Sequence, residues 1–274
     1  MSVVHSRKVA FRHERDRAGL GHLNRPRRSE EKISGMQDTN LMCSYKLRAQ
    51  HNLEVTPTSE KYWNPPSYGL ASRLPPSKSA KTARGSVAYG DHVIPFESEL
   101  EHRILLTLMA RTDVADIQGQ YPVLRFVDAN GKTCKHTADF CVRFTDGYEV
   151  AVVVKMERKR ADMLLLIERM KAYGTDGAVD DIRFLSEKNG SFEAAANARN
   201  VLWSRKWHDQ NEIEQVLNLL KKLQGFFRFG DLLWGCGNMS ARRVAIWRLI
   251  DQGILVSTTG EEITELTWLR KITA

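Results

Sequence analysis

Residues 135–155 have the sequence KHTADFCVRFTDGYEVAVVVK, in which two extended runs flank the dipeptide Asp146-Gly147. Asp-Gly between such runs is typical of a tight β-hairpin turn. The second run, residues 150–154, is apolar at every position, which predicts a central strand buried on both faces. Because the strands of a hairpin are antiparallel neighbours, Asp139 and Lys155 are expected at the same edge of the sheet.

The sequence around this hairpin predicts an α/β core with a mixed sheet. Ser98 is a candidate N-cap, followed by Glu99 and Glu101 in the first helical turn, where the helix dipole favours carboxylates. Apolar residues then recur at helical spacing to about residue 110. The other expected elements are strands at residues 121–127, 138–144 and 148–156, a turn at 130–131, a helix at 161–172 and a strand at 181–185. The apolar run 164–167 is predicted to pack in the core, and the pair Trp203 and Trp207 in the core or between domains.

Residues 210–274 predict a second, smaller domain behind a core domain at residues 86–209. The expected elements are a helix near 213–222, a short helix at 226–234, a third helix capped by Ser240 and ended by Gly253, and β-type runs at 254–257 and 263–268. This order is typical of a winged helix-turn-helix. Arg242, Arg243 and Arg248 on the third helix are therefore candidate DNA-binding residues, although winged helices also bind proteins.

Positive charge is concentrated ahead of both domains. Residues 1–90 contain 16 lysines and arginines against 7 acidic residues, whereas the remainder contains 25 against 26. Residues 1–85 lack sustained periodicity and contain two proline pairs, which predicts a largely disordered basic arm. Such an arm indicates contact with a polyanion such as nucleic acid, the alternative being a tail that only aids solubility.

Cysteine usage and hydropathy exclude several classes of protein. The four cysteines are scattered without a CxxC pair, which excludes a structural zinc site and favours reduced thiols in a cytoplasm. No apolar run approaches the roughly 18–20 residues that span a bilayer, and the N-terminus lacks the apolar segment of a signal peptide. A cytoplasmic protein without membrane partners is expected.

The expected convergence of Asp139 and Lys155 indicates metal-dependent phosphodiester chemistry. A carboxylate can bind Mg²⁺ and orient a water for attack, while a lysine stabilises the nucleophile or the developing charge. Four motifs occur in order: FESELE at 96–101, QYP at 120–122, HTADF at 136–140 and VVK at 153–155. Together they resemble the TnsA endonucleases, whose pattern is Ser-x-x-Glu, Gln-Pro, His-x-Pro-Asp-Phe and Glu/Gln-x-Lys. That family belongs to the PD-(D/E)xK, restriction-endonuclease-like superfamily and carries a winged-helix domain behind the nuclease core.

The resemblance covers the chain from about residue 96 onward and implies a role for each matching residue. Glu101 matches the helix glutamate of the family, Asp139 its metal-binding aspartate and Lys155 its catalytic lysine. The backbone carbonyl of Val154 is implied as a further ligand for Mg²⁺, which Mn²⁺ can replace. The implied function is the DNA endonuclease subunit of a heteromeric cut-and-paste transposase, which nicks the 5′ strands at transposon ends. The implied partners are double-stranded DNA, a DDE-type transposase subunit and an AAA+ ATPase regulator, in the nucleoid-associated fraction of a bacterial cytoplasm.

Val153 departs from the family pattern, because the position two before the lysine should be Glu or Gln. Valine neither ligates a metal nor holds a water, and Glu149 and Glu157 each lie roughly 13 Å from it along an extended strand. Two hypotheses follow. Either the three matching residues suffice for cleavage, or the chain is a weakened or inactive DNA-binding adaptor that keeps the nuclease fold.

Further alternatives stay open. Glu99 replaces Glu101 as the ligand if the helix is rotated, and His136 is either a structural residue or a base. The basic run of Arg158, Lys159 and Arg160 either contacts the DNA backbone beside the site or begins a solvated helix. A stand-alone resolvase or restriction-type nuclease is the remaining functional alternative.

Overall fold

The structure is a computed structural model of the chain and describes residues 67–73 and 83–272. These described residues all belong to one compact unit. The predicted basic arm lies outside the described residues except for its last part. Residues 67–73, expected to be flexible, instead pair with the body of the protein, through a parallel bridge between Ser67 and His92. Within the described residues, no helix is long and apolar enough to cross a membrane.

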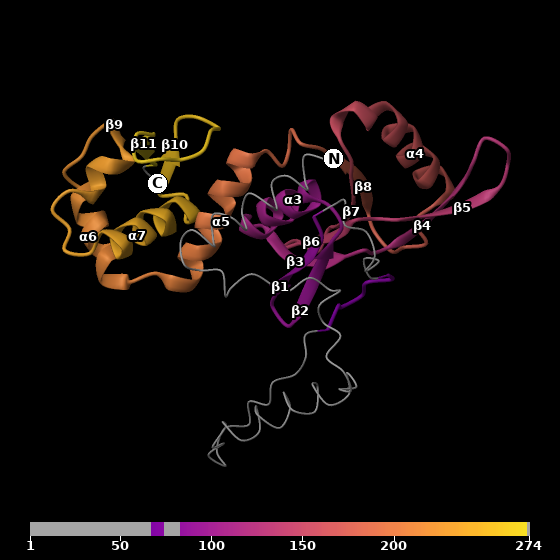
Figure 1. Cartoon of the computed structure of the whole chain (residues 1–274), viewed down its shortest axis with the longest axis horizontal. Coiled ribbons are helices and arrows are strands. Elements are labelled where there is room, and N and C mark those ends of the chain that lie inside the picture. Colours follow the sequence, from indigo (N-terminus) through magenta and orange to yellow (C-terminus); the bar gives the residue numbers. More distant parts are fainter. Residues whose placement is uncertain (1–66, 74–82, 273–274) are drawn as a thin grey trace, which may run out of the picture. The chain divides into compact units, whose positions relative to one another are not determined.

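A four-stranded mixed sheet forms the α/β core, as predicted (Figure 1). Its strands, in spatial order, are β3 (Val114–Gly119), β6 (Phe140–Phe144), β7 (Glu149–Val154) and β8 (Asp181–Leu185). The pairs β3–β6 and β6–β7 are antiparallel, and β7–β8 is parallel. Residues 150–154 of β7 are all buried, which confirms the central strand.

Alternate side chains of β7 pack against different helices because strand side chains alternate between the two faces of a sheet. Val150, Val152 and Val154 share a core with α3 (Glu99–Ala110). Ala151 and Val153 share a second core with α4 (Arg160–Tyr173). A short 3₁₀ turn, Glu157–Lys159, leads into α4. The sheet therefore lies between two apolar layers, and the ends of its strands are the places where polar side chains gather.

Two hairpins account for the main difference from the predicted strand order. β4 (Val123–Val127) pairs with β5 (Thr133–Thr137), so the turn at 130–131 closes this hairpin and does not lead into β6. A second hairpin joins β1 (Gly85–Tyr89) to β2 (His92–Phe96). The predicted three-stranded meander is therefore wrong. β5 carries the polar sequence TCKHT, which lacks the apolar alternation that identifies strands.

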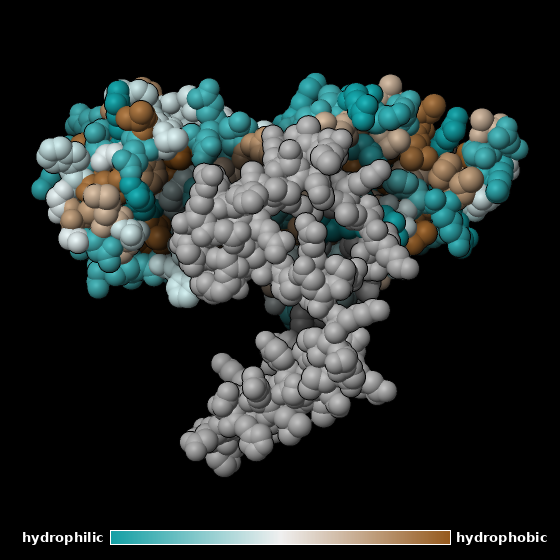
Figure 2. All heavy atoms as spheres, in the orientation of Figure 1, coloured by the Kyte–Doolittle hydropathy of each residue, from teal (hydrophilic) through white to brown (hydrophobic). Residues whose placement is uncertain are grey.

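The apolar run 164–167 is only partly core, contrary to the prediction. Ile167 is buried, but Leu164 and Leu165 are 42% and 56% exposed. Successive residues of an α-helix are rotated by about 100°, so four in a row cannot all face one core. Val123 and Val127 of β4 are also exposed, and Figure 2 shows hydrophobic atoms among hydrophilic ones over the α4 and β4 region.

The C-terminal part begins after α5 (Phe192–Trp207), a helix that the sequence did not predict and that packs against α3 and α7. The elements that follow are α6 (Gln210–Leu220), β9 (Phe226–Arg228), the 3₁₀ turn η3 (Phe229–Leu233), α7 (Met239–Asp251), β10 (Leu255–Ser257) and β11 (Trp268–Lys271). The three strands form a sheet in the order β10-β11-β9.

Three details of this part differ from the sequence prediction. The expected helix at 226–234 is a strand followed by η3, and the second β-type run lies at Trp268–Lys271. Asn238, rather than Ser240, caps α7, because its side chain accepts a hydrogen bond from the backbone N–H of Ala241. The rings of Trp203 and Trp207 lie next to each other in a tilted arrangement at the surface of α5, and both are exposed, so they are not core residues.

Arg205 on α5 joins the end of α3 to the end of α7. Its guanidinium donates to the carbonyl oxygens of Met109 at 2.9 Å and Ala110 at 2.5 Å, in the last turn of α3. The same group binds the buried carboxylate of Asp251 through Nε at 3.0 Å and Nη2 at 2.7 Å. Arg248 also donates to Asp251. One side chain therefore satisfies unpaired carbonyls of one helix and the charge of another.

Candidate functional site

The structure brings Asp139 and Lys155 together at one end of the hairpin formed by β6 and β7. Asp139 directly precedes β6 and Lys155 directly follows β7. The Nζ atom of Lys155 lies 3.8 Å from Oδ2 of Asp139, and the backbone N–H of Val154 donates to the same oxygen at 2.7 Å. Asp139 is 4% exposed, whereas the side chain of Lys155 is 44% exposed. Lys155 therefore pairs with the buried carboxylate while part of its own side chain remains exposed to solvent.

Burial raises the pKa of Asp139 to about 6. That value already includes the raising effect of the negative charge of Glu101 and the lowering effects of Lys155, the hydrogen bond from Val154 and the charge of Arg73. A carboxyl held back from ionising by desolvation ionises more readily when a cation binds beside it. This environment favours a cation or a positively charged group next to Asp139.

Glu101 lies in the first turn of α3 with its carboxylate buried near Asp139. Its oxygens accept hydrogen bonds from the backbone N–H of Glu97 at 2.6 Å and from Oγ of Ser98 at 2.9 Å. Ser98 in turn accepts from the backbone N–H of Glu101, which completes a capping arrangement. Glu99 is exposed instead. The helix rotation that would exchange the two glutamates is therefore not observed.

Three buried polar atoms around this pair have no hydrogen-bond partner among the described residues. They are Oε1 of Glu97, Nε2 of Gln120 and Nε2 of His136. Burial lowers the pKa of His136, and the nearby charges of Lys155 and Arg73 lower it further, so its ring is neutral at neutral pH. Buried polar groups are nearly always satisfied, so such a group of unsatisfied atoms marks a place for water, an ion or a ligand.

The side chains around Asp139 determine how a divalent metal ion could be held there. In the part of the chain that the structure describes, no group of three or more His, Cys, Asp or Glu side chains is placed to hold a metal ion. Asp139 and Glu101 provide two neighbouring carboxylates. Mg²⁺ is commonly held by one or two carboxylates together with water and substrate phosphates. The donor set therefore fits a Mg²⁺ ion that is completed by water and phosphate, and it does not form an all-protein cage.

Val153 lies in the apolar core where the family pattern has Glu or Gln. It is 0% exposed and packs in the same cluster as Ala138, Ile167 and Met170. In the ladder, Phe140 of β6 pairs with Val152, and Val153 is the next residue of β7. No carboxylate replaces it from the same strand face.

Glu157 has other partners, and Glu149 lies at the far end of β7. Hydrogen bonds from Ser186, Arg160 and Lys188 lower the pKa of Glu157 to about 2. Glu149 begins β7 at the opposite end of the strand from Lys155. The carboxylate missing at position 153 is therefore not supplied by either glutamate.

The basic run after Lys155 is exposed at the start of α4. Lys159 pairs with Asp162 at 3.2 Å, and Arg160 pairs with Glu157 at 2.7 Å. Arg158 is likewise exposed. These side chains begin a solvated helix, as one alternative expected, and their position next to Lys155 in the chain leaves the DNA-contact alternative open.

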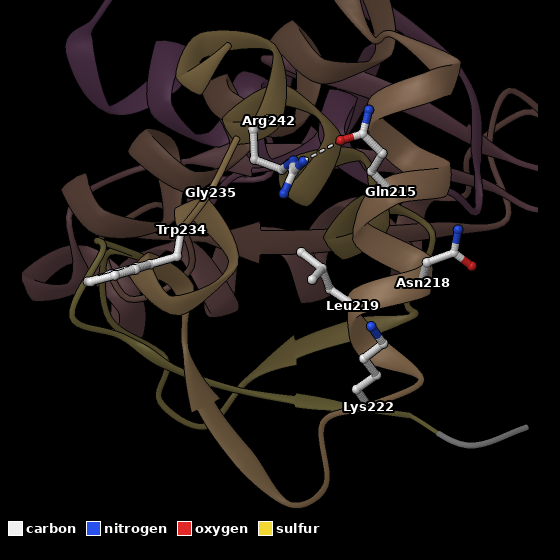
Figure 3. A pocket seen from close by; sticks show the side chains of 7 residues that line it. All are labelled: Gln215, Asn218, Leu219, Lys222, Trp234, Gly235 and Arg242. Carbon is white, nitrogen blue, oxygen red and sulfur yellow. Dashed lines mark hydrogen bonds between the residues drawn. The ribbon is translucent and has the colours of Figure 1, made fainter. Parts of the chain in front are cut away.

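Arg242 is a buried structural residue, which corrects its expected role as a DNA contact. Its side chain is 3% exposed and binds the carboxylate of Glu212 at 2.5 Å, the amide oxygen of Gln215 at 2.7 Å and the carbonyl of Leu232 at 3.2 Å. Figure 3 shows Arg242 turned toward Gln215 at the wall of a cavity of about 250 Å³. The Arg242 side chain is directed toward α6 because the buried carboxylate of Glu212 requires a positively charged partner.

The other two arginines of α7 differ from each other. Arg248 pairs with the buried Asp251 and belongs to the link made by Arg205. Arg243 remains on the surface, where it pairs with Glu265. Of the three predicted DNA-binding arginines of α7, Arg243 is the one with an accessible, solvent-facing pair.

Two residues of the site were not selected from the sequence. Arg73 donates through Nε to Oε1 of Gln120 at 2.8 Å and through Nη2 to Glu97 at 3.2 Å. Gln120 was noted only as part of the QYP motif. Arg73 lies between two proline pairs in a region without periodicity, so the sequence offered no signal for it. The site is thus built from five separate segments of the chain.

Comparisons with known proteins add no relative to this picture. The assignment of the site rests on the geometry around Asp139 and on the order of the motifs that contain it. No protein-family model matches the chain, and no curated protein matches it.

Proposed function

We propose that the α/β core is a Mg²⁺-dependent DNA endonuclease domain of the PD-(D/E)xK kind. The observation that carries this proposal is the Asp139–Lys155 pair, 3.8 Å apart at one end of an antiparallel hairpin, with Glu101 buried beside it. The mixed sheet with a helix on each face agrees with a restriction-endonuclease-like core. Unsatisfied polar atoms around the pair leave places for substrate and water.

The residues divide the work of phosphodiester hydrolysis among them. A bound Mg²⁺ ion would neutralise phosphate charge and make a bound water more acidic. Asp139, fixed by the N–H of Val154, and Glu101 are the side chains that would hold it, with the Val154 carbonyl as a further candidate ligand. Lys155 reaches the site from solvent and would orient the attacking water or stabilise charge on the phosphate.

The full chain is proposed to act as the endonuclease subunit of a heteromeric cut-and-paste transposase that nicks the 5′ strands at transposon ends. Its support is the order of the four motifs and the arrangement that follows them, in which α6, η3 and α7 precede the β10–β11 strand pair. We propose a winged helix for this part. A DDE-type transposase and an AAA+ ATPase would be the partners, and their genes beside this one would support the assignment.

A second function is a DNA-binding adaptor that has lost cleavage. The observation that favours it is Val153, which is fully buried in an apolar cluster at the position where a further metal-binding or water-holding group is expected. Under this alternative the fold and the DNA contacts persist without hydrolysis.

Nicking of supercoiled plasmid DNA in Mg²⁺ or Mn²⁺ separates the two functions. The chain should nick DNA, and Asp139→Asn and Lys155→Met should abolish nicking. Asp162→Asn is the matched control, because Asp162 is an exposed aspartate that pairs with Lys159 outside the site. A folded, DNA-bound chain that never nicks, with or without its transposase partner, supports the adaptor. Nicking that survives Asp139→Asn removes this site from the mechanism.

A further inference from the structure

The geometry points to a DNA phosphate-binding site formed by Arg73 and Gln120, beside Asp139. It rests on the proposed function, because it names how the substrate of that site is held. The ligand class is a phosphodiester of the DNA backbone.

Residues 67–73 are fixed to the core by backbone contacts. The N–H of Val93 donates to the carbonyl of Ser67 at 2.8 Å, and the N–H of Leu70 donates to the side chain of Gln118 at 2.9 Å. Ser72 donates through both its backbone N–H, at 3.0 Å, and its hydroxyl, at 2.8 Å, to the carbonyl of Gln120. Arg73, the residue that follows Ser72, is therefore held beside the site because the segment before it is bound to the core.

The guanidinium of Arg73 is anchored on one side and open on the other. Nε donates to Gln120 and Nη2 to Glu97, yet the side chain is 48% exposed. A guanidinium carries five N–H donors in a planar fork that suits phosphate oxygens. The charge of Arg73 lowers the pKa of both Asp139 and His136, so Arg73 lies within electrostatic reach of both. The remaining donors of this half-exposed side chain are available to an anion.

Gln120 supplies a second donor whose direction is set by Arg73. Oε1 must be the atom that accepts from Nε of Arg73, so the unpartnered atom is the donor Nε2. Gln120 is 0% exposed, and its φ of 51° is in the left-handed region that non-glycine residues rarely adopt. Its backbone N–H donates to the carbonyl of Asp139 at 2.8 Å. Strained, buried residues of this kind concentrate at functional sites.

The donors around Asp139 match the needs of a phosphodiester. Arg73, Lys155 and the amide of Gln120 are donors, and the neutral His136 can present one N–H. Phosphate oxygens are acceptors only, so they can satisfy the Gln120 amide, which has no described acceptor. The acidic side chains nearby weaken anion binding, and removing one of those charges makes the donors easier to observe.

The test measures DNA binding by the full chain in the Asp139→Asn background without metal. The probe is a short fluorescein-labelled DNA duplex, titrated at several salt concentrations. Arg73→Gln removes the positive charge. Gln120→Glu is a nearly isosteric change that keeps the acceptor for Arg73, replaces the free donor by an acceptor and adds a negative charge. Arg143→Gln is the matched control, because Arg143 is an equally exposed arginine that pairs with Asp116 toward the far end of β6.

Arg73→Gln is expected to weaken binding about tenfold, the effect of losing one hydrogen bond to a charged group. Gln120→Glu should weaken binding at least as much, because the added carboxylate also repels the phosphate. Arg73→Gln should also reduce the slope of log K against log salt by about 0.9, the value for one phosphate contact on duplex DNA. Arg143→Gln and Ser72→Ala should bind like their parent, since the first lies elsewhere and the second only removes one tether.

Unchanged affinity and salt slope in Arg73→Gln and Gln120→Glu would overturn the inference. So would an equal loss in Ser72→Ala, which would assign the effect to undocking of residues 67–73. If Gln120→Glu does not fold, as judged by thermal unfolding, the salt slope of Arg73→Gln decides. Failure of the nuclease is distinguishable, because binding is measured without cleavage. Nicking with no Arg73 effect refutes this site alone, and an Arg73 effect without nicking refutes the nuclease alone.

Discussion

Replacing Asp139 by asparagine is expected to stabilise the fold at neutral pH while abolishing cleavage. Burial raises the pKa of Asp139 to about 6 from the ordinary value of 3.8. The folded chain therefore binds this proton more tightly than the unfolded chain does. The resulting stability is fully present below pH 3.8 and is lost as the pH rises to about 6. Above that pH, the ionised carboxylate opposes folding.

The size of the effect follows from the two pKa values. The interval between 3.8 and about 6 corresponds to about 3 kcal/mol at about 1.36 kcal/mol per pKa unit. Asparagine avoids this cost because it has no charge, and its side-chain oxygen can still accept from the N–H of Val154. The opposing attraction of Lys155 is already part of the pKa. The gain in stability at pH 8 should therefore approach about 3 kcal/mol, or roughly 6–12 °C in Tm for a domain of this size.

Urea unfolding followed by circular dichroism, in EDTA, measures this gain. The difference between Asp139→Asn and the unchanged chain should be small near pH 4 and reach its full value above pH 7. The exposed substitution Asp162→Asn should change little at either pH. Equal or lower stability of Asp139→Asn at pH 8, or a difference that does not vary with pH, would refute the reasoning.

The other predictions concern burial. Val153→Glu should lower the free energy of unfolding by about 3 kcal/mol or more in urea unfolding, because it places a carboxylate in an apolar core. A variant that is as stable as the parent would show that position 153 is accessible to solvent. Arg242→Ala should cost about 3–5 kcal/mol because Glu212 loses its buried partner, whereas Arg243→Ala should cost less than about 0.5 kcal/mol; equal costs would contradict the burial of Arg242. Burial raises the pKa of Cys141 to about 12, so iodoacetamide at pH 8 should leave it unmodified in the folded chain, as checked by mass spectrometry; labelling as fast as in urea would contradict this.

Elements with a strong apolar pattern were predictable from the sequence, and elements with small or polar residues were not. The apolar run of β7 and the capped helix α3 were identified with nearly correct bounds. Helix α5 was missed because its buried side chains are small, Ala195, Ala198 and Ser204, and leave no apolar stripe to detect. Strand β5 is polar and pairs only with β4, so its existence depends on a partner that local sequence does not specify.

The sequence predicts those parts of the site whose residues are separated by only a short stretch of chain. The tight turn at Asp146-Gly147 fixes Asp139 and Lys155 at one edge, and geometry alone places them together. Arg73 is delivered by tertiary contacts with Gln118 and Gln120, which no periodicity reveals. Arg242 was assigned to DNA because its helix position suggested it, but the buried Glu212 on α6 determines which way the side chain turns.

The bridge made by Arg205 has a consequence for how the fold opens. Carbonyl oxygens at the end of α3 and the carboxylate of Asp251 at the end of α7 depend on the same guanidinium. If the end of either helix frays, the guanidinium of Arg205 is displaced and the end of the other helix loses its hydrogen bonds to it. Both ends are therefore expected to exchange their amide hydrogens with solvent as one cooperative unit. The helix that carries Glu101 and the helix that carries Arg243 would then share a single local opening event. In the Arg205→Lys variant, exchange at the two helix ends should become independent.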